Sequence, residues 1–363
     1  MRPTPAKAPT ALELALSPEQ CRRFGARIVE WQRVHGRHDL PWQQRRDPYA
    51  IWISEIMLQQ TQVTTVVPYY LRFLQRFPDV GTLAAASLDE VLQLWSGLGY
   101  YSRARNLHRA AVTVAAQHAG AFPREPVELA RLAGIGRTTA AAIAALAYGS
   151  SCAILDGNVK RVLCRYFATA GDPGSVALER RLWALAERLV PARSAAVYTQ
   201  GMMDLGATVC VRQAPQCERC PLALDCVAYR TGRVGDYPQP RARVHLRERT
   251  VAMLLLRHRD QVLLEKRPAH GIWGGLWSLP EADVGALPGD ICARRFGVEA
   301  ARVTALPCVQ HGFTHFRLRI EPWQVEVRSL SNFAAEAGAA WFTLEEAHAA
   351  ALPAPIRRIL EAQ

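Results

Sequence analysis

Lysine is almost absent from this sequence of 363 residues, which contains only Lys7, Lys160 and Lys266. Any reaction that needs a lysine amine as nucleophile is therefore limited to three positions. Nearly all of the positive charge is arginine: Lys and Arg number 44 against 32 Asp and Glu, a net charge of +12. Residues 1–230 carry most of the excess, with 27 Lys and Arg against 18 Asp and Glu. Such an excess favours a polyanionic partner such as nucleic acid but does not identify one.

Long hydrophobic runs are also missing. No segment approaches the roughly 20 apolar residues that a membrane-spanning helix needs, and the longest candidate, the alanine-rich stretch 138–149, predicts a buried helix. The first ten residues, MRPTPAKAPT, contain no hydrophobic segment of the kind found in secretion signals. We therefore expect a cytosolic protein with no membrane partner. The length allows two domains of about 150 residues each.

Nine cysteines in a cytosolic chain argue against a disulfide framework. Five are scattered and are best interpreted as small core residues: Cys21, Cys152, Cys164, Cys292 and Cys308. The other four form a C-x6-C-x2-C-x5-C pattern at residues 210–226: Cys210, Cys217, Cys220 and Cys226. Four thiolates this close in sequence can hold one metal centre, either Zn²⁺ or an iron–sulfur cluster. The spacing alone leaves that choice open.

Helical periodicity extends over residues 17–230 and then stops. Asp47 followed by Pro48 predicts a capped helix start, with helices over 49–60 and 62–77. Alternating apolar runs at 251–257 and 262–266, two strand-like stretches around Pro322 within 313–327, and a closing helix near 352–361 predict a smaller α+β domain. The predicted organisation is a disordered tail (1–16), a helical domain (17–230), a Pro- and Arg-rich linker (231–248) and an α+β domain (249–363).

Residues 132–140, LAGIGRTTA, fit a helix–hairpin–helix pattern. Gly134 and Gly136 allow a tight turn around Ile135, which directs backbone N–H groups outward at the start of the next helix. Such N–H groups can bind a DNA phosphate without reading sequence. A G-x-G pair alone is weak evidence, but Arg137 and the helix that follows strengthen this interpretation.

Two carboxylates stand out. Asp156 lies in ILDGNVKRV (154–162), where helix capping is the simpler interpretation and stabilisation of positive charge on a sugar is the functional one. Glu55 lies in WISEIMLQQTQ (52–62) among apolar residues. It is therefore either structurally paired or protonated through a raised pKa. Together the two would supply the acid and the stabiliser that glycosidic bond cleavage needs.

The hairpin, Asp156 and the four-cysteine loop together resemble the endonuclease III superfamily of DNA glycosylases. Four further segments are similar to its adenine-specific, MutY-type branch: LPWQ (40–43), SEIMLQQTQV (54–63), GLGYYSRARNL (97–107) and LDGNVKRV (155–162). The match is close over about residues 20–230 and looser beyond. The resemblance implies an all-α helix–hairpin–helix glycosylase domain followed by a C-terminal α+β Nudix-like domain.

The resemblance also implies a chemistry. A 4Fe-4S cluster would bind the four cysteines of the loop, Glu55 would protonate adenine at N7 and then handle the attacking water, and Asp156, supported by Asn158, would stabilise the oxocarbenium-like sugar. The substrate would be double-stranded DNA with adenine opposite 8-oxoguanine, and also opposite guanine, in base excision repair at the nucleoid. The protein is expected to act as a monomer.

The resemblance further implies the DNA contacts. Because the target base is inaccessible inside a duplex, adenine must be flipped out, and Trp42, Gln43 and Gln200 would help to form its pocket. Leu40, Gln60 and Thr61 would contact the oxidised guanine, and Tyr100 would wedge into the base stack. An ordinary core position is a serious alternative for Tyr100 and Trp42.

Position 138 separates two chemistries within the superfamily. Related bifunctional enzymes carry a lysine there that forms a Schiff base and permits strand cleavage, whereas this chain has Thr138, with only Lys160 nearby in sequence. We therefore predict a monofunctional enzyme that releases adenine and leaves an abasic site.

In the tail, GIWGGLWSLP (271–280) resembles the glycine-rich stretch of Nudix hydrolases, but their acidic Mg²⁺-binding helix is absent after Glu281. We therefore predict no nucleotide hydrolysis. Phe313, Thr314 and His315 match the loop by which the family touches oxidised guanine. A strand-end polar pair is the plainer interpretation of His311 and His315.

Two alternatives remain open on the sequence. One is a bifunctional, endonuclease III-like glycosylase for oxidised pyrimidines, which Thr138 and the added tail oppose. The other is a non-catalytic iron–sulfur DNA-binding protein, which the presence of both Glu55 and Asp156 opposes.

Overall fold

The computed structural model describes residues 16–239, 246–329 and 338–362. Most of the expected tail and residues 240–245 of the expected linker lie outside the described residues. The contacts divide the chain into two compact units: unit 1 is Met1–Ala84 with Arg109–Arg243, and unit 2 is Ala85–His108 with Val244–Gln363. Of the three divisions between the units, the last, between residues 243 and 244, falls within the predicted linker. The assignment of Ala85–His108 to the C-terminal unit is a feature that no sequence pattern indicated.

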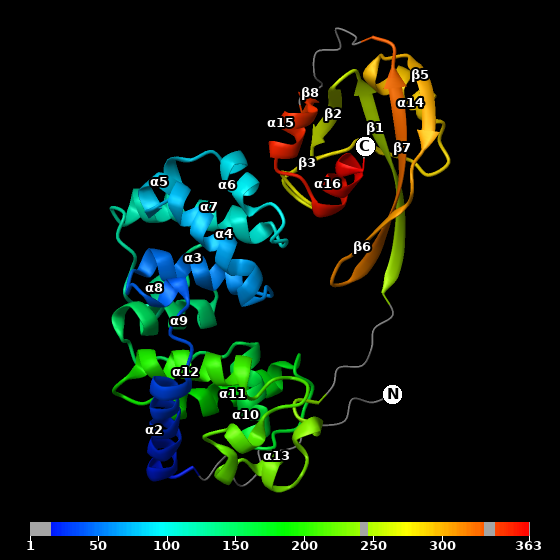
Figure 1. Cartoon of the computed structure of the whole chain (residues 1–363). Helices are drawn as coiled ribbons and strands as arrows, with labels where there is room; N and C mark the ends of the chain where they lie inside the picture. Colours follow the sequence, from blue (N-terminus) through cyan, green and yellow to red (C-terminus); the bar gives the residue numbers. More distant parts are fainter. Residues whose placement is uncertain (1–15, 240–245, 330–337, 363) are drawn as a thin grey trace. The chain divides into compact units, whose positions relative to one another are not determined.

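Unit 1 is helical, as the sequence predicted (Figure 1). The expected helix at 49–60 is observed one residue shorter and that at 62–77 two residues shorter, and the alanine-rich stretch forms a buried helix. Its elements are α2 (Pro18–His35), η1 (Pro41–Gln43), α3 (Pro48–Leu58), α4 (Val63–Arg76), α5 (Val80–Ala85), the end of α7 (Ser102–Gln117), α8 (Pro126–Leu129), α9 (Arg137–Tyr148), α10 (Gly157–Tyr166), α11 (Val176–Leu189), α12 (Ala195–Thr208), η2 (Cys217–Arg219), η3 (Ala223–Asp225), α13 (Val227–Arg230) and η4 (Val234–Asp236).

Local caps set where the helices of unit 1 begin and end. The Asp47 side chain accepts hydrogen bonds from the backbone N–H groups of Tyr49 and Ala50, which confirms the predicted start of α3. Gly149 ends α9 with a φ of 73°, a left-handed conformation that glycine adopts without steric cost. Helix α3 packs against α9, and α12 packs against α2, α9 and α10. These contacts place α3, α9, α10 and α12 in one connected group of helices.

Unit 2 contains α6 (Leu88–Trp95), the first part of α7, and a sheet with three further helices. The sheet order is β3-β2-β1-β7-β5, with β4 on β1, β6 on β7 and β8 on β2. Residues Val251–Leu256 of β1 are all buried, as expected for a central strand covered on both faces. The elements are β1 (Arg247–His258), β2 (Gln261–Lys266), β3 (Trp277–Ser278), β4 (Glu281–Ala282), α14 (Pro288–Phe296), β5 (Ala300–Ala305), β6 (Val309–Gly312), β7 (Phe316–Val327), β8 (Ala339–Thr343), α15 (Leu344–Ala349) and α16 (Ala354–Glu361).

The expectation of two strand-like stretches around Pro322 is wrong, because β7 runs through this residue without a break. Pro322 faces the junction between two partner strands: β6 pairs up to Ile320, and β5 pairs from Trp323. Its carbonyl accepts a hydrogen bond from Leu306 on that side. The missing N–H of proline therefore falls where one partner has ended and the other has not begun, so no ladder hydrogen bond is lost.

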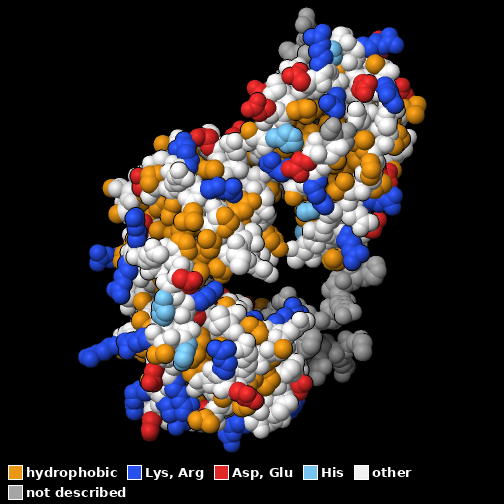
Figure 2. Space-filling view, in the orientation of Figure 1, with side chains coloured by type: hydrophobic (Ala, Val, Ile, Leu, Met, Phe, Trp, Pro, Cys, Tyr) orange, Lys and Arg blue, Asp and Glu red, His pale blue; other side chains and the backbone are white. Residues whose placement is uncertain are grey.

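Among the helices of the described residues, none combines the length and apolarity that crossing a membrane requires. Figure 2 shows Lys and Arg side chains spread over the viewed face, interspersed with fewer Asp and Glu.

Candidate active site

Glu55 on α3 and Asp156 at the start of α10 lie close to one another in unit 1. Burial raises the pKa of Glu55 to about 7, and the charge of Asp156 adds to this shift. Burial also raises the pKa of Asp156, but hydrogen bonds and the charge of Arg161 oppose the shift. The structure therefore brings together two carboxylates with raised pKa values, of which Asp156 accepts hydrogen bonds that favour its ionised form.

Asp156 caps α10 and is held in place by its neighbours. Its Oδ1 accepts from the backbone N–H of Val159 at 2.7 Å, and its Oδ2 accepts from Asn158 Nδ2 at 3.1 Å. The Oδ1 of Asn158 in turn accepts from Arg161 at 2.8 Å, and Arg161 also donates to the carbonyls of Gly206 and Cys210. The capping interpretation of Asp156 thus describes its geometry, while its position beside Glu55 suits it to act on a substrate.

A pocket of about 310 Å³ in the same unit is lined by Trp42, Gln43 and Gln200, the three residues expected to surround a flipped adenine. Ile51 and Ser54 of α3 line it too, within one turn of Glu55. Trp42 is buried and packs edge-on against a tyrosine ring, so it is also a core residue. Both polar atoms of the Gln43 amide are buried and lack a hydrogen-bond partner among the described residues. An unpaired buried amide is costly unless a ligand satisfies it.

Asp204, which our sequence reasoning missed, does not line this pocket but contacts two residues that do, Arg37 and Gln200. Its fully buried carboxylate accepts from the backbone N–H and the guanidinium of Arg37 and from Gln200 Nε2 at 2.9 Å. Because a carboxylate only accepts, it fixes the Gln200 amide with Nε2 inward and leaves Oε1 as the group that can face the pocket. The sequence feature that could have indicated this pair is the spacing of four residues between Gln200 and Asp204 on α12, which is mostly apolar.

The hairpin has the geometry predicted for phosphate binding. Gly134 has a φ of 78°, and Gly136 is the N-cap of α9, with no side chain to cap the helix. Both glycines are exposed, while Ile135 between them is buried. The first N–H groups of α9 are thereby presented at a positive helix end. Thr138 lies half-buried in this first turn, and Lys160 forms an ion pair with Glu179 at 2.8 Å.

The predicted lesion contacts in unit 1 differ in exposure. Leu40 is buried and precedes η1, whereas Gln60 is exposed with a φ of 59°, a strained conformation for a residue with a side chain. Thr61 follows it, with a backbone hydrogen bond to Leu58. The neighbouring Gln59 donates to Thr139 of α9 at 3.3 Å, which ties this turn to the hairpin helix.

The four predicted metal ligands interact with one another. Burial raises the pKa of the Cys220 thiol to about 12, and Cys210, Cys226 and Cys217 each add to the shift. In the described part of the chain, no three His, Cys, Asp or Glu side chains converge on a point that a single ion could fill. The loop thus brings four thiol donors together, and their mutual repulsion as thiolates calls for positive charge among them.

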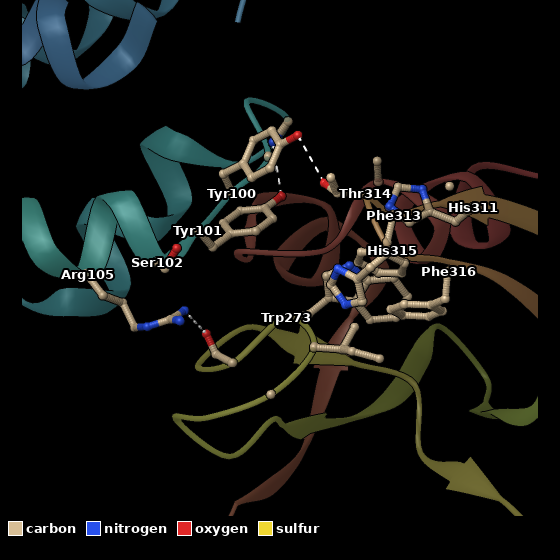
Figure 3. A pocket seen from close by; sticks show the side chains of 17 residues that line it. Tyr100, Tyr101, Ser102, Arg105, Trp273, His311, Phe313, Thr314, His315 and Phe316 are labelled. Carbon is tan, nitrogen blue, oxygen red and sulfur yellow. Dashed lines mark hydrogen bonds between the residues drawn. The ribbon is translucent and has the colours of Figure 1, made fainter. Parts of the chain in front are cut away.

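Unit 2 contains a second pocket, of about 630 Å³, where Tyr100 meets the loop formed by Phe313, Thr314 and His315 (Figure 3). Tyr100 is 45% exposed and has a φ of 49°, so it is no core residue. Its hydroxyl lies 3.5 Å from the Thr314 hydroxyl. Phe313 stacks on Phe316 with ring centroids 4.5 Å apart. Two segments distant in sequence, both expected to contact the lesion, therefore line one aromatic cavity.

Fold and site together define a class, the helix–hairpin–helix enzymes that act on bases in DNA, with an added Nudix-like domain. The family model described as "HhH-GPD superfamily base excision DNA repair protein" matches residues 53–188, and that described as "NUDIX domain" matches residues 251–362. A solved thermostable thymine-DNA glycosylase is 30% identical with a TM-score of 0.52, covering 59% of this chain and 98% of its own. An endonuclease III–DNA complex, 24% identical with a TM-score of 0.50 and covering 60% and 99%, supports the fold alone.

Curated proteins with similar sequences identify the family within this class. An adenine DNA glycosylase of Buchnera aphidicola subsp. Baizongia pistaciae is 35% identical over 340 residues, covering 93% of this chain and 95% of its own. The human adenine DNA glycosylase is 34% identical over 399 residues, covering 93% and 73%. The chain belongs to the adenine DNA glycosylase family.

Proposed function

We propose that this protein is a monofunctional DNA glycosylase that removes adenine paired with 8-oxoguanine, and also with guanine, from double-stranded DNA. The observation that carries the proposal is the pair of Glu55 and Asp156, in which Glu55 has a pKa of about 7. A carboxylic acid that is still partly protonated at neutral pH is suited to general acid catalysis.

The two carboxylates have separate roles in the proposed mechanism. Protonated Glu55 donates its proton to N7 of the flipped adenine, which makes the base a better leaving group as the N-glycosidic bond breaks. The ionised carboxylate of Asp156, oriented by Asn158 and Val159, stabilises the positive charge that develops on the deoxyribose. Glu55, now ionised, accepts a proton from the water that attacks the sugar, and an abasic site remains.

The hydrogen-bonding groups of the pocket match adenine. Gln200 presents an acceptor, because Asp204 holds its amide nitrogen, and Gln43 presents one unpaired donor and one unpaired acceptor. The exocyclic amino group of adenine offers two N–H donors, and a ring nitrogen offers an acceptor. A purine with a carbonyl at position 6 would place two acceptors face to face, which is costly in a buried site.

We also propose that Cys210, Cys217, Cys220 and Cys226 hold a 4Fe-4S cluster. Four thiolate donors within one loop can hold such a cluster, and the resemblance to the endonuclease III superfamily favours it over zinc. Bound there, the cluster would cross-link the loop after α12 and supply the positive iron charge that the thiolates need. In addition, the Asp225 side chain accepts hydrogen bonds from α2 through Arg27, so the loop is fastened to the helical body.

The exposed hairpin at Gly134 and Gly136 is proposed to bind a backbone phosphate, which positions the duplex without reading its sequence. Recognition of the oxidised guanine is assigned to Leu40, Gln60 and Thr61 in unit 1, and to Tyr100, Phe313, Thr314 and His315 in unit 2. The Thr314 hydroxyl can donate or accept a hydrogen bond at the modified edge of the base. The expected place of action is the cytosol, at the nucleoid.

The test is single-turnover incubation of the purified protein with duplexes containing 8-oxoguanine opposite adenine, followed by identification of the free base and of any strand cleavage. Adenine release without cleavage supports the proposal. Release of an oxidised pyrimidine from a control duplex, or robust β-elimination that survives Lys160→Ala, would favour the bifunctional alternative. Binding without release of any base would favour a non-catalytic DNA-binding protein.

A further inference from the structure

Arg165, in the last turn of α10, is a charged side chain with only 3% of its surface exposed. Its Nη1 lies 3.3 Å from the sulfur of Cys210 and 2.7 Å from the carbonyl of Val211. Its other nitrogens donate to the carbonyls of Arg212 and Tyr237. One guanidinium thus hydrogen-bonds both a predicted metal ligand and the backbone that follows this ligand.

The backbone of Arg165 touches a second predicted ligand, because its carbonyl lies 3.5 Å from the sulfur of Cys226. The residue therefore lies between the first and the last cysteine of the loop. These two cysteines are the farthest apart of the four in sequence, so Arg165 lies beside both ends of the loop.

The charge of Arg165 has no carboxylate partner among its hydrogen bonds in the described residues, all of which go to carbonyl oxygens or to sulfur. A buried cation without a compensating anion is strongly unfavourable. A cluster bound by four thiolates carries net negative charge and would compensate it. The position of this arginine is thus explained by an anionic centre at the cysteine loop.

We propose that Arg165 is a positioning residue for the metal centre: its guanidinium holds Cys210 at the cluster and favours the reduced, more negative state. This inference rests on the proposed cluster. Hydrogen bonds to the sulfurs and nearby charge are recognised determinants of iron–sulfur potentials. Reduction adds one electron to the cluster. A positive charge and an N–H donor at Cys210 therefore stabilise the reduced cluster more than the oxidised cluster. Removing them must therefore lower the reduction potential.

The test measures the cluster potential by protein-film voltammetry, with the electrode as electron source, and iron and sulfide content by chemical assay. Arg165→Gln removes the charge and keeps one N–H donor, while Arg165→Lys keeps the charge but lacks the forked donors. The matched control is Arg233→Gln, which removes an equal charge from an exposed ion pair with Asp236. We expect a large negative shift for Arg165→Gln, a smaller one for Arg165→Lys and none for the control.

Equal potentials for the wild-type protein and both Arg165 variants would overturn the inference while leaving the cluster in place. If Arg165→Gln purifies without a cluster, the test uses the reduction potential of Arg165→Lys instead. An unshifted potential in Arg165→Lys then overturns the inference. Wild-type protein free of iron and sulfide would overturn the proposed cluster, and this inference with it.

Discussion

The carboxyl group of Glu55 on α3 lies close enough to that of Asp156, at the start of α10, for the charge of Asp156 to raise its pKa. Glu55 gains this shift in addition to a larger one from burial, whereas Asp156 is partly compensated by its hydrogen bonds. The hydrogen bonds to Asp156 favour its ionised form, which fits the proposed roles of Glu55 as the acid and Asp156 as the charged stabiliser. The first three predictions below follow from this pair.

Glu55→Gln should abolish base release while leaving DNA binding intact. The amide has nearly the shape of the acid but cannot deliver a proton, and general acid catalysis contributes about 10²–10⁴ in rate. Single-turnover release of adenine should fall by at least about 100-fold, with duplex affinity unchanged in a gel-shift titration. Glu30→Gln, an exposed carboxylate on α2, is the matched control. Wild-type rates in Glu55→Gln would remove Glu55 from the mechanism.

The rate of adenine release should depend on the protonation of Glu55. Since its pKa is raised to about 7, the acid form is depleted above this pH, and the single-turnover rate should fall about tenfold per pH unit in the alkaline range. The residual rate of the Glu55→Gln variant should not show this fall in the alkaline range. A wild-type profile that stays flat from pH 6 to pH 9 would contradict the assignment.

Glu55 should also reduce stability at alkaline pH. Its pKa rises from 4.5 in the unfolded chain to about 7 in the folded protein, so the folded state binds more protons between these values and stability falls as pH rises through them. Glu55→Gln should therefore raise the free energy of unfolding by up to about 3 kcal/mol at pH 8, with almost no gain at pH 4.5. Urea denaturation at the two pH values measures this difference. A gain of equal size at both would show that the carboxylate is not the cause.

Asp204→Asn should relax the preference for adenine. The asparagine can donate as well as accept, so Gln200 is no longer held with its carbonyl toward the pocket. The release rate of adenine relative to hypoxanthine, each placed opposite oxidised guanine, should fall by about tenfold or more, the effect of one mispaired buried hydrogen bond. Because the ratio compares two substrates on one variant, a general loss of stability cancels. An unchanged ratio would show that Asp204 does not set the orientation of Gln200.

Thr314→Val should weaken discrimination between oxidised guanine and guanine opposite the adenine. Valine has the shape of threonine but lacks the hydroxyl that lies beside Tyr100. The ratio of release rates from the two duplexes should fall by roughly 5- to 30-fold, which corresponds to the loss of about one to two hydrogen bonds. Thr314→Ser keeps the hydroxyl and should retain the ratio. A serine variant as impaired as the valine variant would point to packing instead.

Elements that depend on residues close together in sequence were predictable. Asp47 and Pro48 mark a helix start because capping needs only neighbouring residues. The short apolar runs that became β1 and β2 indicated strands. Pro322 misled the prediction, because its tolerance within β7 depends on which strands lie beside it. The packing of Ala85–His108 with the C-terminal unit likewise has no local signature.

The sequence by itself determined the helical and α+β domains, the cysteine loop, the hairpin glycines and the two separate motifs that contain Glu55 and Asp156. Only the tertiary structure decided the acidity of Glu55, the orientation of Gln200 by Asp204 and the placement of Arg165 against Cys210. The reason is physical. Motifs and periodicities record a residue's neighbours along the chain, whereas a pKa or a hydrogen bond depends on groups that folding brings together from distant parts of it.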